Sequence, residues 1–208
     1  MTAEAGGIEA SRLRVLVVVG SLRAQSATRT VALQAVALLR GAGMAVDVLD
    51  LAVEPLPLLN TDSSFAAPGF AALRERVVKA DVLVLCTPDY HGGISGAMKN
   101  FLDHFWHEFA GKLFATVVAS HEKGLTVHDQ IHTVARQCNA WALPYGVSFV
   151  DKEDVREGKH LSEALRLRLE MLSGDVGTYG ALLAAQRRQD LAGTGAGFLA
   201  RLRPRAEG

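Results

Sequence analysis

Short polar side chains gather directly after an apolar run, in the stretch GSLRAQSATR over residues 20–29. Ser21, Ser26 and Thr28 can donate hydroxyl hydrogen bonds, and Arg23 can add a charge-assisted one. The stretch opens a segment of helical period, whose first N–H groups lack partners and lie at the positive end of the helix. Together these groups favour an anion such as a phosphate monoester. The simpler interpretation is a serine N-cap with arginines facing solvent.

This stretch matches neither of the two common glycine-rich phosphate loops. GxGxxG and GxxxxGK[ST] both need glycines that residues 20–29 lack. A dinucleotide pyrophosphate, or a nucleoside triphosphate held with magnesium, therefore fits poorly.

A second polar stretch, TPDYHGGISGAMKNFLDHF over residues 87–105, also follows an apolar run. Pro88 fixes the exit of the chain, Tyr90 offers a flat amphipathic surface, and Gly92 permits close approach of the backbone to a ligand. These features suit a planar ring. The simpler interpretation is a tyrosine in a glycine-rich turn before a helix.

The apolar pattern predicts the elements that position these stretches. Most of the strand-like runs are apolar without alternation, as strands covered on both faces are; the runs are 14–19, 45–51, 81–86, 113–119 and 146–150. Segments of helical period alternate with them, over 27–43, 69–80, 95–109, 124–143 and 161–189, the last with candidate breaks at Gly174 and Gly177. This alternation predicts an α/β fold, a doubly wound five-stranded parallel sheet with helices on both faces.

Ligands of such a sheet bind beyond the carboxyl ends of the strands, where the strand order reverses. The segments that follow the first, third and fourth strands are 20–29, 87–95 and 120–124. Both polar stretches fall in these segments, so we expect them to meet at one edge of the sheet, next to the loop SHEKG.

Taken together, the two stretches resemble the NADPH-dependent FMN reductase family. Its pattern is G-S-x-R-x-x-S-x-[NT]-R after the first strand and P-x-Y-x-x-x-x-x-G-x-x-K-N-x-x-D after the third. The matching residues are Gly20, Ser21, Arg23, Ser26, Thr28 and Arg29, and then Pro88, Tyr90, Gly96, Lys99, Asn100 and Asp103. The resemblance covers roughly residues 14–150 and implies a flavodoxin-like fold. It also implies that the first motif binds the FMN phosphate and the second cradles the isoalloxazine ring.

The candidate FMN-binding residues come from the three loops; they are Ser21, Arg23, Ser26, Ala27, Thr28, Pro88, Asp89, Tyr90, His91, Gly92, Ser120, His121, Lys123 and Gly124. Asp89 stands where the family usually has glutamate, and residues 120–124 lack the paired glycines of many members. Lys123 and the amides of residues 90–92 are candidates to stabilise negative charge on reduced flavin. We assign no catalytic acid or base, because the cofactor carries the chemistry.

The predicted activity is that of an FMN-dependent NAD(P)H oxidoreductase. Hydride passes from NADPH or NADH to bound FMN, and electrons pass on to a small molecule such as a flavin, a quinone, an azo compound or a metal oxyanion. A flavodoxin-like electron carrier without turnover is the alternative, although such carriers tend to be acidic and this chain has a pI of about 7.1. A phosphate-sugar binding protein without flavin is the third interpretation.

Composition limits the other classes of function. With 208 residues, and with Lys+Arg and Asp+Glu equal at 22 each, the chain suits one domain without a nucleic-acid-binding face. No apolar run is long enough to span a bilayer, and the start of the chain lacks a secretory apolar region, so we expect a cytoplasmic protein. The expected domain is 13–190, with flexible tails at 1–12 and 191–208.

Two histidine pairs, His104 with His107 and His128 with His132, lack a third ligand at a readable spacing, so no metal site is predicted. The segment 95–109 carries more large apolar residues than one core-facing stripe accommodates: Met98, Phe101, Leu102, Phe105, Trp106 and Phe109. This excess predicts a homodimer or homotetramer that pairs through this helix, and the family resemblance implies the same. The alternative is that the C-terminal helix covers the patch within one chain.

Overall fold

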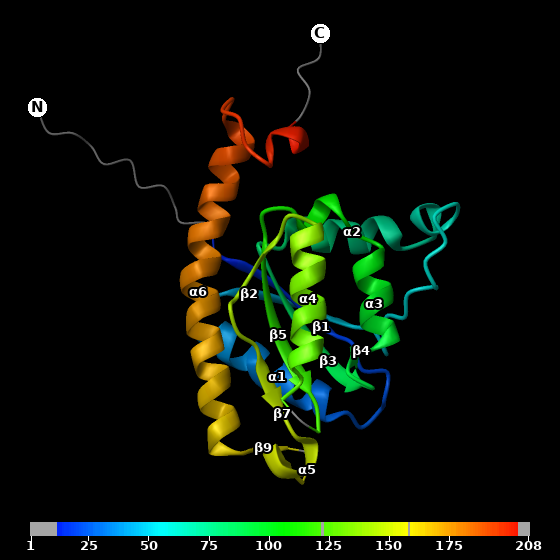
Figure 1. Ribbon diagram of the computed structural model, residues 1–208, viewed down its shortest axis with the longest axis vertical. Helices are drawn as coiled ribbons and strands as arrows, with labels where there is room; N and C mark the ends of the chain where they lie inside the picture. Colours follow the sequence, from blue (N-terminus) through cyan, green and yellow to red (C-terminus); the bar gives the residue numbers. More distant parts are fainter. Residues whose placement is uncertain (1–11, 122, 158, 204–208) are drawn as a thin grey trace, which may run out of the picture.

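The computed structural model describes residues 12–121, 123–157 and 159–203. Its strands are β1 (Arg14–Val19), β2 (Ala45–Asp50), β3 (Val82–Tyr90), β4 (Gly93–Ile94), β5 (Leu113–Ala119), β6 (Trp141–Ala142) and β7 (Val147–Phe149). The order β2-β1-β3-β5-β6 is parallel throughout, β7 also pairs with β5 in parallel, and β4 is antiparallel to β3. This order confirms the predicted α/β fold with a central parallel sheet (Figure 1).

The described sheet has seven strands rather than the predicted five. The fifth position is divided, because β6 pairs with Leu113 and Phe114 while β7 pairs with residues 117–119. Pro144 lies between the two pieces and has no N–H to continue the ladder. The other added strand, β4, is the return arm of a tight hairpin at the end of β3.

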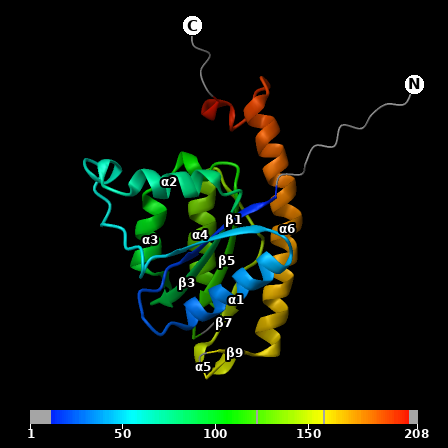
Figure 2. The same cartoon turned by 180° about the vertical axis from the view of Figure 1, so that it is seen from behind.

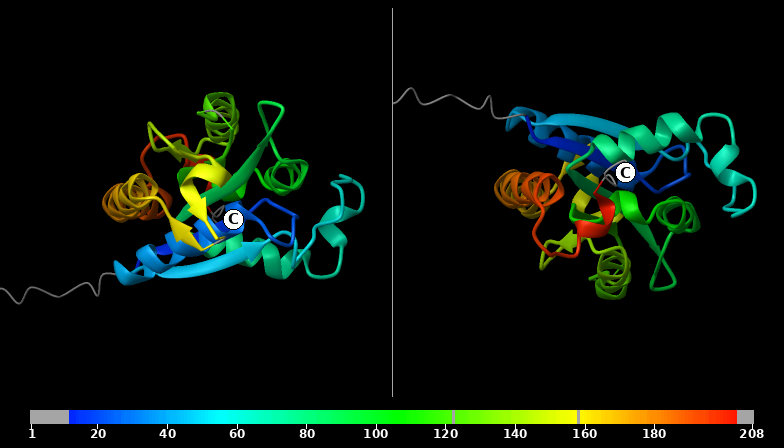
Figure 3. Two further views of the ribbon diagram at one scale, coloured as in Figure 1. Left: turned by 90° about the horizontal axis from the view of Figure 1, so that it is seen from below. Right: turned by 90° about the horizontal axis from the view of Figure 1, so that it is seen from above.

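Helices cover both faces of the sheet, as Figures 2 and 3 show. Helices α1 (Ala27–Gly41) and α6 (Glu163–Ala192) pack on one face with β1 side chains such as Val15, Val17 and Val19. Helices α2 (Phe70–Lys79), α3 (Gly96–Asp103) and α4 (Leu125–Gln137) pack on the other face with Leu16 and Val18. Successive side chains of β1 point to opposite faces of the sheet, so this one strand contributes to both hydrophobic cores.

The shorter elements lie in the connections. They are η1 (Ser64–Ala66), η2 (His107–Phe109), α5 (Asp151–Asp154), the antiparallel pair β8 (Val155–Arg156) and β9 (His160–Leu161), and η3 (Ala200–Leu202). Within the described residues, no helix is both long and apolar enough to cross a membrane.

Two predicted helix ends and one candidate helix break were wrong. The helix predicted over 95–109 ends at Asp103, and the one predicted over 124–143 ends at Gln137, just before Asn139 takes a left-handed φ of 54°. Helix α6 is continuous through Gly174 and Gly177. Each glycine costs a helix about 1 kcal/mol, and the buried face of α6 on the sheet offsets that cost.

The apolar side chains of 95–109 are covered within the chain. Only Trp106 among the six is exposed, at 61%, and the rest lie in the core formed with α2. Phe70 at the start of α2 stacks on Phe105 with ring centroids 5.7 Å apart. The excess of apolar side chains therefore requires neither a partner subunit nor α6 as a cover, and that expectation was wrong.

Lys112 is a buried lysine with a structural role. The residue is only 1% exposed. Its Nζ donates to the carbonyl oxygens of Val77, Val78 and Ala80 at 2.5, 2.8 and 2.5 Å. These carbonyls end α2, so the ammonium group caps that helix from the start of β5. Burial lowers the pKa of Lys112 to about 7.

Part of the predicted C-terminal tail packs on the domain. Leu199 is buried, and Arg203 donates to the carbonyl of Asp190 at 2.7 and 2.8 Å. Residues 1–11 and 204–208 lie outside the described residues.

Candidate functional site

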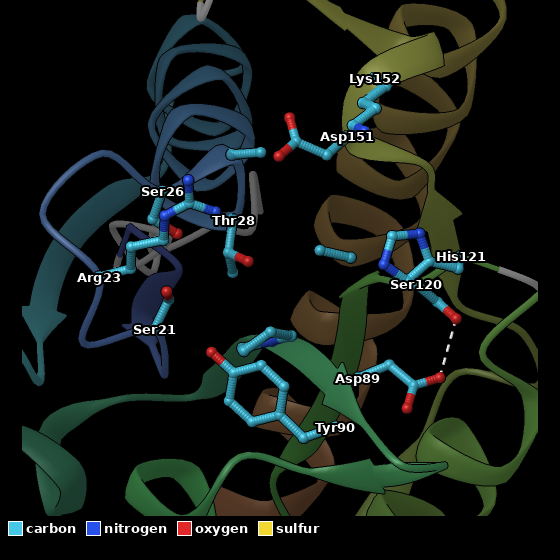
Figure 4. Close-up of a pocket in the computed structure, with 13 residues that line it drawn as sticks. Ser21, Arg23, Ser26, Thr28, Asp89, Tyr90, Ser120, His121, Asp151 and Lys152 are labelled. Atoms are coloured by element: carbon cyan, nitrogen blue, oxygen red, sulfur yellow. Dashed lines mark hydrogen bonds between the residues drawn. The ribbon is translucent and has the colours of Figure 1, made fainter.

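A cavity of about 240 Å³ opens at the carboxyl edge of the sheet (Figure 4). Its walls come from the loops after β1, β3 and β5 and from α5; they are Ser21, Arg23, Ser26, Ala27, Thr28, Pro88, Asp89, Tyr90, Ala119, Ser120, His121, Asp151 and Lys152. The structure thus brings together the predicted residues of all three loops.

The remaining predicted residues line a neighbouring hollow of about 800 Å³; they are His91, Gly92, Lys123 and Gly124. The two spaces share Asp89, Ser120 and His121 as walls. A ligand longer than the first cavity can therefore extend into the second.

The loop after β1 is anchored at Gly20. Its N–H donates to the carbonyl of Cys86 at 2.7 Å, and its carbonyl accepts from Ser95 Oγ at 2.6 Å. A Cβ at Gly20 would lie only 3.0 Å from atoms of Met98, so a larger residue would push the loop away from α3. Ser95 also accepts from Met98 N–H and so caps α3 with the same hydroxyl.

Arg29 holds the rest of this loop, and all five of its N–H groups are used. Nε and Nη2 donate to the two carboxylate oxygens of Asp50 at 2.5 and 3.0 Å. The remaining three donate to the carbonyls of Ser21, Arg23 and Ala24 at 3.2, 2.7 and 2.9 Å. The hydrogen bonds from Arg29 hold the pKa of Asp50 below its usual value. Arg29 therefore has no donor left for a ligand.

These contacts leave amide groups of the loop free. The C=O and N–H of one trans peptide point in opposite directions, so turning three carbonyls toward Arg29 turns the N–H groups of residues 22, 24 and 25 away from it. Within the described residues, none of these three N–H groups has a hydrogen-bond partner, nor do those of Ala27 and Thr28 in the first turn of α1. Such a set of free amides at a helix N-terminus is suited to an anion.

Side-chain donors surround the same space. In Figure 4, Ser21, Arg23 and Thr28 face the cavity from one side. Ser26 Oγ accepts the N–H of Arg29 at 3.3 Å as the N-cap of α1, which leaves its own O–H to donate. The cavity end formed by residues 21–28 therefore offers amides, hydroxyls and one guanidinium to a phosphate.

The turn after β3 is a two-residue hairpin. His91 and Gly92 both have a positive φ, 58° and 76°, as the favoured type I′ hairpin turn requires. Asp89 ties this hairpin to the next loop, because its Oδ1 accepts from Gly92 N–H and its Oδ2 from Ser120 Oγ, each at 2.8 Å. The aspartate in the usual glutamate position thus holds the two ring-side loops together.

The loop after β5 is supported by hydrogen bonds that involve His128 on α4. Ser148 Oγ donates to the carbonyl of Lys123, so its oxygen must accept from His128 Nε2 at 2.9 Å. His128 Nδ1 then accepts from Thr116 Oγ1 at 2.6 Å. Burial lowers the pKa of His128, which favours the neutral ring that this arrangement needs. Together with Gly124 at a φ of 61°, these contacts fix the loop without a pair of glycines.

Three walls of the cavity were not predicted from the sequence: Ala119, Asp151 and Lys152. Asp151 and Lys152 follow β7, the fifth strand, at the same carboxyl edge as the other loops. The signal that could have identified Asp151 and Lys152 is their position directly after the fifth strand, since ligands bind beyond the carboxyl ends of parallel strands.

The residues present fit FMN. Free amides and hydroxyls at one end suit its phosphate, and Pro88 with Tyr90 offers a flat apolar wall farther along. Among the described residues, no group of three or more side chains could hold a metal ion. The fold and the site together define a flavodoxin-like flavoprotein.

Comparison with known proteins identifies the family. The family model for NADPH-dependent FMN reductases matches residues 13–154, so the chain belongs to that family and is an FMN-dependent NAD(P)H oxidoreductase. This confirms the resemblance seen in the two motifs.

Among the relatives, an NADPH azoreductase of Bacillus sp. (strain OY1-2) is 32% identical over 155 residues, which cover 73% of this chain and 80% of that protein. An FMN-dependent NADPH-azoreductase of Staphylococcus haemolyticus (strain JCSC1435) is 38% identical over 99 residues, or 44% of this chain and 52% of that one. A solved oxidoreductase from Corynebacterium diphtheriae shares the fold, with a TM-score of 0.65 at 19% identity, covering 84% of this chain and 98% of the other.

Proposed function

We propose that the loops around the cavity bind FMN and that the enzyme passes electrons from NADPH or NADH to a small aromatic acceptor, with azo compounds as the first class to test. The azoreductase relatives support this choice of acceptor. The observation that carries the proposal is the set of free amides and hydroxyls over residues 21–28, beside the flat wall of Pro88 and Tyr90.

At the phosphate end, the proposed ligands are the side chains of Ser21, Arg23, Ser26 and Thr28 and the amides of the first turn of α1. Arg29 acts indirectly, since it orients the loop through Asp50 and three carbonyls. Lys152 adds a second cation across the cavity, where it offsets the carboxylate of Asp151.

At the ring end, Pro88 and Tyr90 pack against one side of the flavin, and Ser120 and His121 border it from the next loop. Bound FMN supplies the redox chemistry, accepting hydride and delivering electrons onward. Lys123 and the amides near Gly92 would supply positive charge and hydrogen-bond donors beside the ring of bound FMN. Asp89 keeps both loops at a fixed separation while this occurs.

The test is a steady-state assay with purified protein, in which NADPH oxidation is followed with and without added FMN and with an azo dye, a quinone or FMN as the acceptor. We expect turnover that depends on FMN and an azo dye that loses its colour. Bound flavin with no NADPH oxidation would support the electron carrier instead. Failure to bind any flavin would favour the third interpretation, a phosphate-sugar binding protein.

We propose that the enzyme assembles as a homodimer or homotetramer and that the surface around residues 95–109 is one contact. The support is the exposed Trp106 beside a hollow of about 920 Å³ that Phe65 and His107 also line. Changing Trp106→Glu should lower the particle mass in light scattering if this surface is an interface. We also place the protein in the cytoplasm, and its two unpaired cysteines, Cys86 and Cys138, agree with that compartment.

A further inference from the structure

A small cavity lies away from the candidate flavin site. It measures about 190 Å³ and is formed by the connection after β2, the start of α2 and the end of α3, elements that Figures 1 and 2 show together. Of its described walls, none also borders either space of the flavin site. Most of the walls are apolar, and they include Leu49, Leu56, Pro57, Pro68, Phe70 and Leu73.

One polar side chain that lines this cavity is buried and only partly bonded. His104 is 4% exposed, and its Nδ1 donates to the carbonyl of Asn100 at 2.7 Å. In the neutral ring Nε2 is then an acceptor, and within the described residues no donor reaches it. Every fully enclosed side-chain nitrogen or oxygen in the same part of the chain has a partner, so Nε2 borders an open space.

His104 lines two such spaces. The small cavity and the hollow of about 920 Å³ beside Trp106 share only Phe70 and His104 among their described walls. The larger hollow has charged walls such as Glu75 and Asp103, which suit water better than an apolar ligand. The small cavity matches a single aromatic ring, since an apolar cavity of about 150 Å³ already holds benzene.

Asn100 holds two parts of this cavity in place. Its backbone carbonyl orients the imidazole of His104. Its side chain accepts from Leu59 N–H and donates to the carbonyl of Pro57, each at 2.9 Å. The acceptor and the loop after β2 are therefore fixed before a ligand arrives, which lowers the cost of binding.

The remaining polar groups limit the kind of ligand. Ser64 Oγ accepts from Asn60 N–H at 2.8 Å, which leaves its own O–H to donate. Glu54 is the one carboxylate among the described walls, and its Oε2 accepts from Arg76 at 2.8 Å. A charged ligand would meet no free counter-charge, whereas a neutral hydroxyl group can donate to His104 and accept from Ser64.

We propose that this cavity binds a neutral aromatic molecule that carries a hydroxyl or amino group, with its ring beside Phe70 and Leu73 and its donor on His104 Nε2. The azo bond and the quinone carbonyl only accept hydrogen bonds, whereas the amines and hydroquinones formed by their reduction also donate them. The site therefore recognises products of the proposed reaction rather than its acceptors. This choice of natural ligand rests on the proposed function, whereas the site itself does not.

The first test measures the affinity for phenol by isothermal titration calorimetry at pH 8, with FMN present to fill the flavin site and NADPH absent. We expect wild-type protein to bind phenol and Ala67→Leu to weaken binding by at least about tenfold, because the added side chain fills the cavity. Ala71→Leu is the matched control, since Ala71 lines only the larger hollow and should leave the affinity unchanged. Circular dichroism confirms that each variant is folded.

The other outcomes of this titration contradict the proposal. Wild-type protein that does not bind phenol would overturn it, and so would binding that survives Ala67→Leu. Loss of binding in Ala71→Leu alone would place phenol in the larger hollow, which also overturns it.

The second test isolates the hydrogen bond to His104. Toluene has a methyl group in place of the hydroxyl of phenol, and His104→Leu removes the acceptor while keeping a side chain of similar size. We expect the variant to lower the affinity for phenol by about three- to tenfold and not to lower that for toluene. Equal losses for both ligands would show that shape alone is affected and would overturn the role of Nε2.

These results are separable from the proposed function. Protein that binds phenol as expected but does not oxidise NADPH would keep the site and lose the proposed reaction. Protein that oxidises NADPH but does not bind phenol would keep the reaction and overturn the site.

Discussion

The two ends of the candidate flavin site are held by charges of opposite sign. At the phosphate end, the cation Arg29 on α1 gathers three carbonyls and a carboxylate. At the ring end, the anion Asp89 gathers an amide N–H from the hairpin and a hydroxyl from the loop after β5. Arg29 is fully used by the protein, whereas each carboxylate oxygen of Asp89 accepts one hydrogen bond and the residue still lines the cavity.

This difference indicates what each end can select. A cation that occupies carbonyls leaves N–H groups for the ligand, so the loop over residues 21–25 is suited to an anion. A carboxylate that joins two loops fixes the distance between them, so the ring end is suited to a flat group of defined width. Affinity for FMN should therefore depend on both ends, and affinity for riboflavin, which lacks the phosphate, on the ring end alone.

The largest effect is expected for Arg29→Ala. Its removal leaves the partly buried Asp50 unpaired and frees three loop carbonyls, so the free energy of unfolding should fall by about 2–3 kcal/mol. FMN affinity, measured by fluorescence titration, should fall by at least about a hundredfold, equivalent to about 2.7 kcal/mol. Arg29→Lys should recover little of either, because an ammonium group cannot reproduce the planar fork.

The control for Arg29 is Arg166→Ala, which breaks an ion pair with Glu170 between two exposed side chains and should change little. Acid titration gives a second readout. Because Arg29 holds the pKa of Asp50 below its usual value, the pair stabilises the fold above the pKa of a free aspartate, and this contribution is lost as pH falls through the lowered pKa. In Arg29→Ala, less stability should be lost as the pH falls, because the ion pair is already absent. An unchanged acid profile would contradict the role of the pair.

A smaller effect, confined to the phosphate, is expected for Arg23→Ala combined with Ser26→Ala. The change removes one charge and one hydroxyl that point at the cavity, and FMN affinity should fall by between about tenfold and a hundredfold. Riboflavin affinity should stay the same. Ser26 also caps α1, so Arg23→Ala alone serves as the variant with unchanged stability. Equal losses for both flavins would show that this loop does not hold the phosphate.

At the ring end, Asp89→Ala should weaken FMN and riboflavin alike. The variant loses the acceptor for Gly92 N–H and for Ser120 Oγ, so the two loops separate and affinity falls by about tenfold, or about 1.4 kcal/mol. The ratio of the two affinities is the decisive measurement. A ratio that changes with Asp89 but not with Arg23 would reverse the assignment of the two ends.

The smallest effect is expected for Ser148→Ala, which acts through the support of the loop after β5. The variant leaves His128 Nε2 and the carbonyl of Lys123 without Ser148, and the free energy of unfolding should fall by about 1 kcal/mol. Flavin affinity should fall by less than in Asp89→Ala. Ser63→Ala, at an exposed serine whose side chain caps nothing, is the control in chemical denaturation.

The structure brings the hydroxyls of residues 21–28 to one cavity as the sequence predicts, because these residue types record a local requirement. Serine, threonine and arginine beside a helix start satisfy the N–H groups of that same turn, so no distant residue is needed to recognise them. The structural role of Arg29 could not be predicted from the sequence. Asp50 lies 21 residues away, and the loop carbonyls point toward Arg29 only in the folded chain. Asp151 and Lys152 were not predicted because only the segments after the first, third and fourth strands were expected at the site, although the run 146–150 ends just before Asp151.

Helix ends were harder to predict than strands. Apolar spacing continues past Asp103 because Phe105 enters the same core from a turn, and Phe109 enters it from the short 3-10 helix η2. Likewise, the segment after Gln137 keeps an apolar pattern, yet its Trp141 and Ala142 pair with β5. Periodicity reports burial, and a turn that buries the same side chains gives the same pattern.

Chemical labelling of Lys112, the lysine that caps α2, can report how often the protein opens at that helix. The chain contains six lysines, and only Lys112 among those in the described residues is buried. In the closed protein its amine is enclosed and donates to three carbonyls, which keeps reagents away from it. An amine-directed label should therefore reach Lys112 only when α2 separates from β5, and the rate of that labelling would report how often this seam of the native protein opens.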